Sequence, residues 1–239
     1  MSDTPNKWQL GQILLVNKPL HWTSFDVVNK LKFVLLKTYN EKIKIGHAGT
    51  LDPLASGLLV ICTGKKTKEI SDIQDGLKEY TTTLKLGATT PSFDVETKED
   101  NQYPTEHITK TLVYQALDKF IGKQDQIPPI YSAVKTNGKR AYEYARNGEE
   151  LVLQPKQITI YELEIKNIDL PFLTLRVVCG KGTYIRSLAR DIGTTLQSGA
   201  YLTSLVRTRI GAFGLEDAKT VEEMAEIIMN NGEVILDNE

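Results

Sequence analysis

Residues 44–67 read KIGHAGTLDPLASGLLVICTGKKT and hold one aspartate, Asp52, between a Gly-Thr-Leu run and a proline. The apolar run that follows, 58–62, is typical of a buried strand, so this stretch predicts a loop that leads into a sheet. One interpretation of Asp52 is a helix N-cap with Pro53 at the first helical position. The other is a functional carboxylate, and the rest of the chain bears on that choice.

The end of the same stretch, TGKKT at 63–67, resembles part of a phosphate-binding P-loop. That motif needs a glycine separated by four residues from its Gly-Lys pair, and here the position is occupied by Leu59. We therefore expect no nucleotide binding by this route.

The composition is that of an ordinary globular protein, with 41% hydrophobic and 25% charged residues in 239. The polar N-terminus does not resemble a signal peptide, and the apolar runs are too short to span a bilayer, so a cytoplasmic location is expected. Cys62 and Cys179 each end an apolar run, and the three histidines are scattered. Buried free thiols are therefore expected, and a zinc site is not.

The net charge of −1 conceals an uneven distribution, because residues 1–215 carry +6 and residues 216–239 carry −7. Within the first part, the blocks 1–90 and 132–215 are both basic. Two basic blocks indicate a polyanionic partner if they meet in the folded chain. The alternative is a set of solvated faces that never converge.

The periodicity of apolar residues predicts more strands than helices. Tyr80, Thr82, Leu84 and Leu86 share one face of a strand at 79–87. Further strands are expected over 11–19, 58–62, 157–165 and 172–180, with an Asn-Gly turn at 137–138. Helices are expected from Thr23 or Ser24, near 109–121 with Leu112, Val113, Ala116 and Phe120 inward, over 185–196, and after a capping box of Thr220 and Glu223. The predicted class is α+β rather than a doubly wound sheet.

Arg186 stands in the first turn of the predicted helix at 185–196, within GKGTYIRSLARDIG. The helix macrodipole is positive there, so a cation is disfavoured unless an anion lies nearby. One interpretation is an arginine that faces solvent. The other pairs Arg186 with a carboxylate from another strand end, for which Asp52 is the candidate.

A single carboxylate limits the possible chemistry. Glycosidase-type catalysis uses two carboxylates, and the sequence offers no acidic partner with a matching motif. An ionised Asp52 could act as a nucleophile or as an electrostatic stabiliser. An arginine within ~4–6 Å lowers a carboxylate pKa by about 1–3 units. Tyr80 would provide a flat surface, and stacking of a base on an aromatic ring contributes roughly 1–3 kcal/mol.

Five segments in order carry a resemblance to a known family: VNKPLHWTS, GHAGTLDPLASGLL, KEYTTTLKLG, IPPIYSAVKTNGKRAYEYAR and GTYIRSLARDIG. Over about residues 11–215 the chain closely resembles the bacterial tRNA pseudouridine-55 synthases. A cap alone is then a poor account of Asp52, although capping and catalysis are compatible. The resemblance implies the pseudouridine synthase fold, which is α+β with a mixed, mostly antiparallel sheet and with helices and loops around a central catalytic cleft.

The resemblance also implies an activity, the isomerisation of uridine to pseudouridine at position 55 of the tRNA T-loop, without cofactor or metal. The N1–C1′ bond breaks, the uracil turns over, and C5 joins C1′. By motif match, Asp52 is the nucleophile, and the sequence leaves open whether it attacks C1′ or C6. Arg186 would hold Asp52 ionised, and Tyr80 would stack on the flipped uracil and could relay the C5 proton.

Other matched positions surround the base. Tyr184 and Leu205 would wall it, and His47 would contact the T-loop as the target leaves its stack. Flipping costs a few kcal/mol, and an apolar wall would keep detached uracil from water. Simpler interpretations remain: Tyr80 and Leu205 as core residues and His47 as a turn residue. Lys18 either braces the catalytic loop or takes part in the chemistry.

Two departures from the family stand out. Position 48 is alanine, where many relatives carry threonine, and only 25 residues follow Gly214. The expected organisation is therefore a catalytic domain at 1–215 and a short acidic helix or tail at 216–239, with no separate PUA domain.

The expected partner is tRNA, through its T-arm, with no membrane and no metal, and the chain is expected to be a monomer. Phosphate contacts are expected from the basic residues near the motifs: Lys65, Lys66, Arg140, Arg146 and Lys181. The alternative function is a non-catalytic tRNA-binding or folding factor. Asp52 separates the two, because a carboxylate near RNA phosphates would only repel in a pure binding protein.

Overall fold

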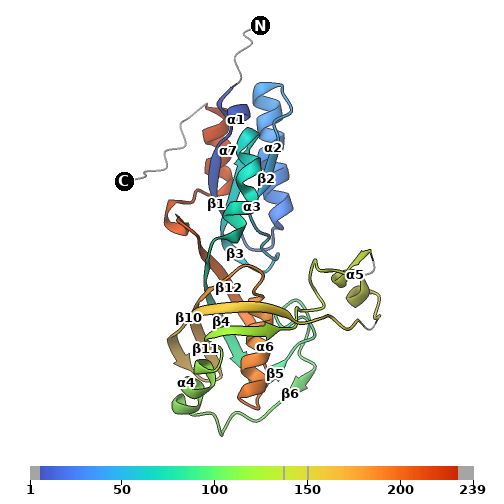
Figure 1. Ribbon diagram of the computed structural model, residues 1–239, viewed down its shortest axis with the longest axis vertical. Helices are drawn as coiled ribbons and strands as arrows, with labels where there is room; N and C mark the ends of the chain where they lie inside the picture. The colour runs from blue at the N-terminus through green and yellow to red at the C-terminus, as the bar shows by residue number, and fades with distance from the viewer. Residues whose placement is uncertain (1–5, 137, 150, 231–239) are drawn as a thin grey trace. The chain divides into compact units, whose positions relative to one another are not determined.

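The structure is a computed structural model that describes residues 6–136, 138–149 and 151–230 (Figure 1). The chain forms two compact units. The first unit holds the described residues up to Tyr80 and those from Val206 onward, and the second unit holds residues 81–205. Strands β4 (Lys78–Leu86) and β12 (Ala200–Ile210) contribute residues to both.

The sheet of the first unit is built on two long antiparallel strands. β1 (Ile13–Lys18) pairs with β3 (Ser56–Thr63), so that Lys18 lies opposite Gly57. β2 (Ile45–His47) pairs antiparallel with the end of β3, and β13 (Phe213–Gly214) pairs antiparallel with β12. The pair between β12 and β3 is parallel. The predicted mixed, mostly antiparallel sheet is therefore confirmed.

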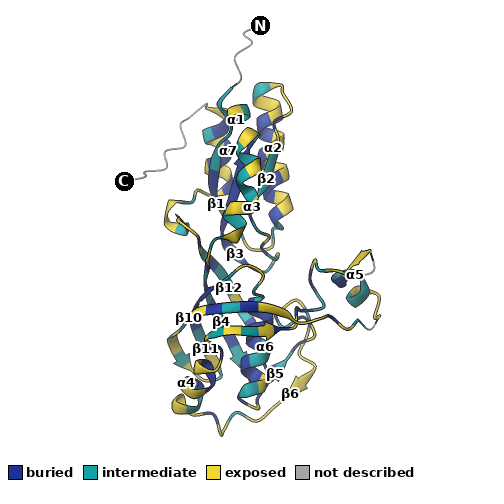
Figure 2. Ribbon diagram, viewed as in Figure 1, coloured by how far each residue is buried: buried dark blue, intermediate teal, exposed yellow. Residues whose placement is uncertain are grey.

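Two capped helices cover the core of the first unit. α2 (Ser24–Tyr39) begins after a capping box of Thr23 and Asp26, and α7 (Val221–Met229) begins after the predicted capping box of Thr220 and Glu223. The buried stripes of both helices pack together with β1 and β3 (Figure 2). Central members of this core are Trp8, Leu14, Val16, Leu31, Leu35, Leu59, Ile61, Met224 and Ile228.

Short helices complete the first unit. They are α1 (Lys7–Leu10), the 3₁₀ helix η1 (Gly64–Glu69), α3 (Ile70–Asp75) and the 3₁₀ helix η2 (Leu215–Asp217). In the TGKKT segment, Thr63 thus ends β3 and residues 64–67 lie in a 3₁₀ helix, which differs from the strand–loop–α-helix context of a P-loop.

In the second unit the strand order is β12-β4-β11-β10-β7. β10 (Lys156–Asp169) and β11 (Phe172–Cys179), which include the two strands predicted there, form an antiparallel pair, and β7 (Gly122–Gln126) pairs with the first part of β10. Residues of β4 alternate between buried and half-buried positions as the sequence predicts. The helices are α4 (Lys110–Asp118), α5 (Ala141–Arg146) and α6 (Ile185–Thr195).

Two short hairpins belong to the second unit. β5 (Ala88–Thr89) pairs with β6 (Asn101–Gln102), and β8 (Lys135–Thr136) pairs with β9 (Lys139–Arg140). Asn137 of the predicted Asn-Gly turn lies outside the described residues, while β8 and β9 on either side of it pair with each other.

Some expectations about buried side chains need correction. In α4 the buried residues are Val113, Ala116 and Leu117, whereas Leu112 is only half-buried. The buried stripe runs through i, i+3 and i+4 from Val113, which leaves the preceding residue at its margin. Both cysteines are buried as expected, and burial raises the pKa of the Cys62 thiol to about 11. None of the helices within the described ranges has the length and apolarity that crossing a membrane requires.

Candidate active site

Asp52 lies in a turn between β2 and β3. The Ala55 N–H donates to the Asp52 carbonyl at 3.1 Å, and β3 begins at Ser56 without an intervening helix. The helix-cap interpretation of Asp52 is therefore wrong. A proline after aspartate also suits a tight turn, and pairing of β3 with β1 and β12 draws the following residues into an extended strand.

The backbone on both sides of Asp52 is fastened to the segment that starts α2. The Ser24 hydroxyl donates to the Leu51 carbonyl at 3.1 Å, and the Leu51 N–H donates to the same hydroxyl oxygen at 2.8 Å. On the other side, the His21 N–H donates to the Pro53 carbonyl at 2.7 Å. These bonds fix the position of the Asp52 Cα.

Lys18 is fully buried at the end of β1. Its ammonium group donates to the Pro19 carbonyl at 2.9 Å and to the Trp22 carbonyl at 2.6 Å. Burial lowers the pKa of Lys18 to about 8, although the nearby Asp52 carboxylate opposes that change. Lys18 therefore braces the chain reversal before α2, and its positive charge interacts with Asp52. Whether it also braces the catalytic loop or takes part in the chemistry stays a prediction.

Two other predicted residues belong to the first unit. His47 is the half-buried last residue of β2, and its pKa is lowered first by burial and then by the positive charge of Arg207. Because the pKa of His47 lies below its ordinary value, its imidazole is mainly neutral at pH 7. Tyr80 is buried on the inner side of β4, where the alternating pattern predicted it.

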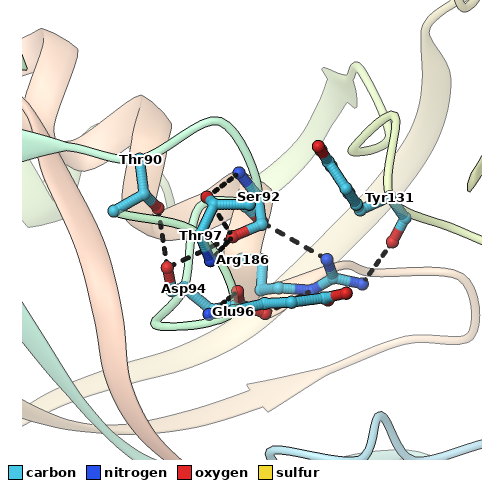
Figure 3. Close-up of polar contacts among 7 residues, drawn as sticks. All are labelled: Thr90, Ser92, Asp94, Glu96, Thr97, Tyr131 and Arg186. Carbon is cyan, nitrogen blue, oxygen red and sulfur yellow. Dashed lines mark hydrogen bonds and ion pairs between the residues drawn. The ribbon is translucent and has the colours of Figure 1, made fainter. Parts of the chain in front are cut away.

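In the second unit, Arg186 is only 4% exposed, so the interpretation as a solvent-facing arginine is wrong. Its guanidinium donates to the Tyr131 carbonyl at 2.8 Å and to the Ser92 carbonyl at 3.3 Å (Figure 3). The Nε atom lies 3.6 Å from Oδ2 of Asp94. An anion thus lies beside the cation in the first turn of α6, as the macrodipole argument requires.

Asp94 is held by the turn in which it lies. Its Oδ1 accepts the Glu96 N–H at 2.9 Å, and its carbonyl accepts the Thr90 hydroxyl at 2.7 Å and the Ser92 hydroxyl at 3.2 Å (Figure 3). Sequence reasoning missed this residue. The available signal was its setting in TTPSFDVET, where several hydroxyl side chains around one aspartate are typical of a polar turn.

The beginning of α6 is fixed from a second side by Gln126, another residue that sequence reasoning missed. The Tyr184 N–H donates to the Gln126 side-chain oxygen at 2.8 Å, and the Gln126 amide donates to the Tyr184 carbonyl at 3.1 Å. Gln126 is buried at the end of β7, so it ties α6 to the sheet. Leu205, the other predicted wall residue, is half-buried in β12.

The predicted site residues are therefore shared between the two units. His47, Asp52 and Tyr80 belong to the first, and Tyr184, Arg186 and Leu205 belong to the second. Because each unit is described by itself, the pairing of Asp52 with Arg186 stays a prediction. Within the described ranges, no group of three or more His, Cys, Asp or Glu side chains has an arrangement that could hold a metal ion.

Comparison with known proteins identifies the family of the chain. Residues 36–185 match the model of the N-terminal domain of the TruB family pseudouridylate synthases. The chain belongs to the TruB family. The matched range includes Asp52, Tyr80 and Tyr184, and the resemblance noted in the sequence is confirmed.

Comparisons with individual relatives over most of the chain agree with the TruB assignment. The chain is 56% identical over 217 residues to the tRNA pseudouridine synthase B of Phocaeicola vulgatus. This alignment covers 90% of this chain and 92% of the relative. It is 55% identical over 222 residues to the enzyme of the same name from Parabacteroides distasonis, covering 92% and 94%.

A solved structure supports the TruB fold. A chain in a crystal structure of a Cbf5-Nop10-Gar1 complex superposes with a TM-score of 0.70 at 29% identity. The match covers 92% of this chain and 54% of that chain, so the present sequence corresponds to about half of the longer protein. The pseudouridine synthase fold expected from the sequence is thus confirmed.

Proposed function

We propose that this chain isomerises uridine to pseudouridine at position 55 in the T-loop of tRNA. The observation that carries the proposal is the Asp52 loop. In a chain of the TruB family, a carboxylate lies on a backbone fixed at Leu51 and Pro53, next to the buried ammonium group of Lys18. Curated relatives that cover about nine-tenths of the chain carry the name tRNA pseudouridine synthase B.

In the proposed reaction Asp52 is the nucleophile and the target uridine is flipped out of its stack. The N1–C1′ bond breaks and its electron pair stays with the uracil. After the base turns over, C5 forms the new bond to C1′ and loses its proton, while N1 ends protonated. The bond that Asp52 forms to the substrate, at C1′ or at C6, is broken again before the product leaves, so the carboxylate is regenerated. Substrate and product therefore have the same atoms, and the reaction needs no external oxidant or reductant.

The other matched residues serve this step. Arg186 keeps Asp52 ionised, because an adjacent guanidinium favours the charged form of a carboxylate. Tyr80 stacks on the uracil and relays the C5 proton, and Tyr184 and Leu205 keep the detached base from water. His47, neutral at pH 7, contacts the T-loop as the base leaves its stack.

A basic and aromatic segment supports binding of tRNA phosphates. It consists of β8, β9 and α5, and two of its cations lie over aromatic rings. The Lys139 ammonium lies 5.7 Å from the centre of the Tyr144 ring, and the Arg146 guanidinium lies 5.4 Å from that of Tyr142. Cations ordered in this way suit a phosphate backbone, and binding should weaken as salt rises.

The test is incubation of the purified chain with unmodified tRNA, without added metal or cofactor, followed by mapping of pseudouridine at each nucleotide. We expect product at position 55 only. Asp52→Asn should bind tRNA within about twofold of the wild type and form no detectable product, because an amide is a poor nucleophile. Asp72→Asn, at an exposed aspartate, is the matched control and should retain full activity.

The alternative, a non-catalytic tRNA-binding or folding factor, predicts a different result. In that case the wild-type chain would bind and refold tRNA without forming pseudouridine. Product from a well-folded Asp52→Asn variant would instead remove Asp52 from the chemistry.

A further inference from the structure

Arg207 is a second buried arginine, 2% exposed, on β12 of the first unit. Its Nε donates to the Leu58 carbonyl at 2.8 Å, and its two terminal nitrogens donate to the carbonyls of Gly49 at 3.0 Å and Thr50 at 3.4 Å. All three acceptors are backbone carbonyls in the short stretch around Asp52. One side chain therefore holds both the beginning of the Asp52 loop and the strand that leaves it.

The backbone of Arg207 is locked to the same stretch. Arg207 pairs with Gly57 in the parallel register of β12 and β3. A Cβ atom at Gly57 would collide with the Arg207 carbonyl oxygen and lie 2.9 Å from its nitrogen, and Gly57 has φ +98°. Only glycine allows this approach without strain, so the two strands meet at a fixed separation.

The charge of Arg207 is unusual for a buried group. Within the described parts of the chain, the guanidinium has carbonyl partners and no ion pair with a carboxylate. Its field also reaches its neighbours, since it contributes to the lowered pKa of both Lys18 and His47. A buried cation without a counter-ion is costly, and a hydrophobic residue of similar volume would avoid that cost. This cost indicates that Arg207 has a role beyond core packing.

We propose that Arg207 is a positioning residue that holds the 47–52 loop so that Asp52 presents its carboxylate, and His47 its ring, in the orientation the reaction needs. This inference rests on the proposed function of Asp52. Arg207 itself acts through the loop rather than on the substrate. Its reach of three carbonyls requires the planar fork of a guanidinium, which a lysine ammonium lacks.

The test uses Arg207→Met, Arg207→Lys and a matched control, Arg209→Met. Arg209 lies two residues further along the same strand, but it is exposed and its ion pair is with Glu216 at 3.0 Å. We expect kcat on tRNA to fall about 100-fold in Arg207→Met, because small misplacements of a reacting group have effects of this size. The tRNA dissociation constant should stay within about twofold, and Arg209→Met should match the wild type.

Arg207→Lys keeps the charge but can reach fewer carbonyls, so its kcat should be about tenfold higher than that of Arg207→Met and about tenfold lower than that of the wild type. A merely structural role predicts instead that kcat and tRNA affinity fall together, or that both follow the loss of folded protein. Unchanged kcat in a folded Arg207→Met variant would also overturn the inference. If Arg207→Met does not fold, Arg207→Lys is compared with wild type instead. A lower kcat with an unchanged tRNA dissociation constant supports the positioning role, and a parallel loss of both overturns it.

A second measurement does not depend on activity. NMR titration of the histidine ring protons should show a higher pKa for His47 in Arg207→Met, because a neighbouring cation has been removed, and no change in Arg209→Met. The Gly49 and Leu51 amide resonances should shift in the same variant while those of α7 stay in place. A wild-type chain that forms no pseudouridine would end the proposed function, whereas unshifted loop resonances would end the role of Arg207.

Discussion

The two buried arginines of this protein are held in different ways. Arg186, in the first turn of α6, has two backbone carbonyl partners and the Asp94 carboxylate 3.6 Å away. Arg207, on β12, is held by three backbone carbonyls and no carboxylate in the described chain. Burial is similar in the two cases, so the difference lies in how the positive charge is compensated.

This difference separates two uses of the same side chain. At Arg186 a nearby carboxylate offsets the unfavourable interaction between the guanidinium and the positive N-terminal end of the helix dipole. At Arg207 the guanidinium donates to backbone carbonyls of the loop before Asp52 and of β3, and these hydrogen bonds fix the backbone geometry there. The first arrangement depends on charge balance, and the second depends on close packing of the strands around Gly57.

The largest expected effect tests the charge balance at Arg186. Arg186→Met would leave Asp94 buried without its cation, and we expect the free energy of unfolding to fall by about 3–5 kcal/mol. Urea denaturation measures this loss. In the double variant Arg186→Met/Asp94→Asn the buried carboxylate is gone, so part of the stability should return. A double variant less stable than the single one would contradict the charge argument.

The packing argument at Arg207 is sharpened by Gly57→Ala. The new methyl group would collide with Arg207 backbone atoms, and φ is positive at that position. We expect a loss of roughly 3 kcal/mol in thermal or urea unfolding. Gly122→Ala is the control, because Gly122 has φ +100° and a Cβ atom added there would meet no other atom within 4 Å. The control should cost about 1–2 kcal/mol, from the backbone conformation alone.

Lys18 extends the comparison to a third buried cation, whose charge can be titrated. Its pKa is about 8 in the folded chain against an ordinary value of 10.5, so between these pH values the unfolded state holds more protons. The free energy of unfolding should therefore rise with pH across that interval, by on the order of 2 kcal/mol from this group.

Unfolding measured from pH 7 to 10 checks this contribution by comparing wild type with Lys18→Met. The stability of wild type relative to the variant should improve as pH rises. Lys44→Met, at an exposed lysine, provides the control and should stay parallel to wild type. Parallel curves for wild type and Lys18→Met would show that burial does not perturb Lys18.

The smallest expected effect concerns helix starts. α6 begins without a side-chain cap, in contrast to α2, where the Thr23 hydroxyl accepts the Asp26 N–H at 3.0 Å. Thr23→Ala should lower the free energy of unfolding by about 1 kcal/mol, measured by urea denaturation. Thr38→Ala, at an exposed position in the last turn of α2, should be neutral or slightly stabilising because alanine favours helix.

Much of the fold follows from patterns that span only a few residues. The alternation in β4, the capping box before α7 and the position of α6 depend on local patterns, so the sequence predicted each of them correctly. The order of five motifs likewise identified the family. The errors were local ambiguities: an Asp-Pro pair that forms a turn rather than a helix start, and a helical stripe displaced to Leu117.

Only the tertiary structure decided which polar groups meet. The bond from Arg207 to Gly49 joins residues 158 positions apart, and the bond from Arg186 to Ser92 joins residues 94 apart. Such contacts have no periodic signature, because they depend on how strands pair and which backbone carbonyls are left without partners in the sheet. The sequence by itself determined the elements, the family and the candidate carboxylate at Asp52. The partners Asp94, Gln126 and Arg207 emerged only when folding brought distant segments within hydrogen-bonding distance.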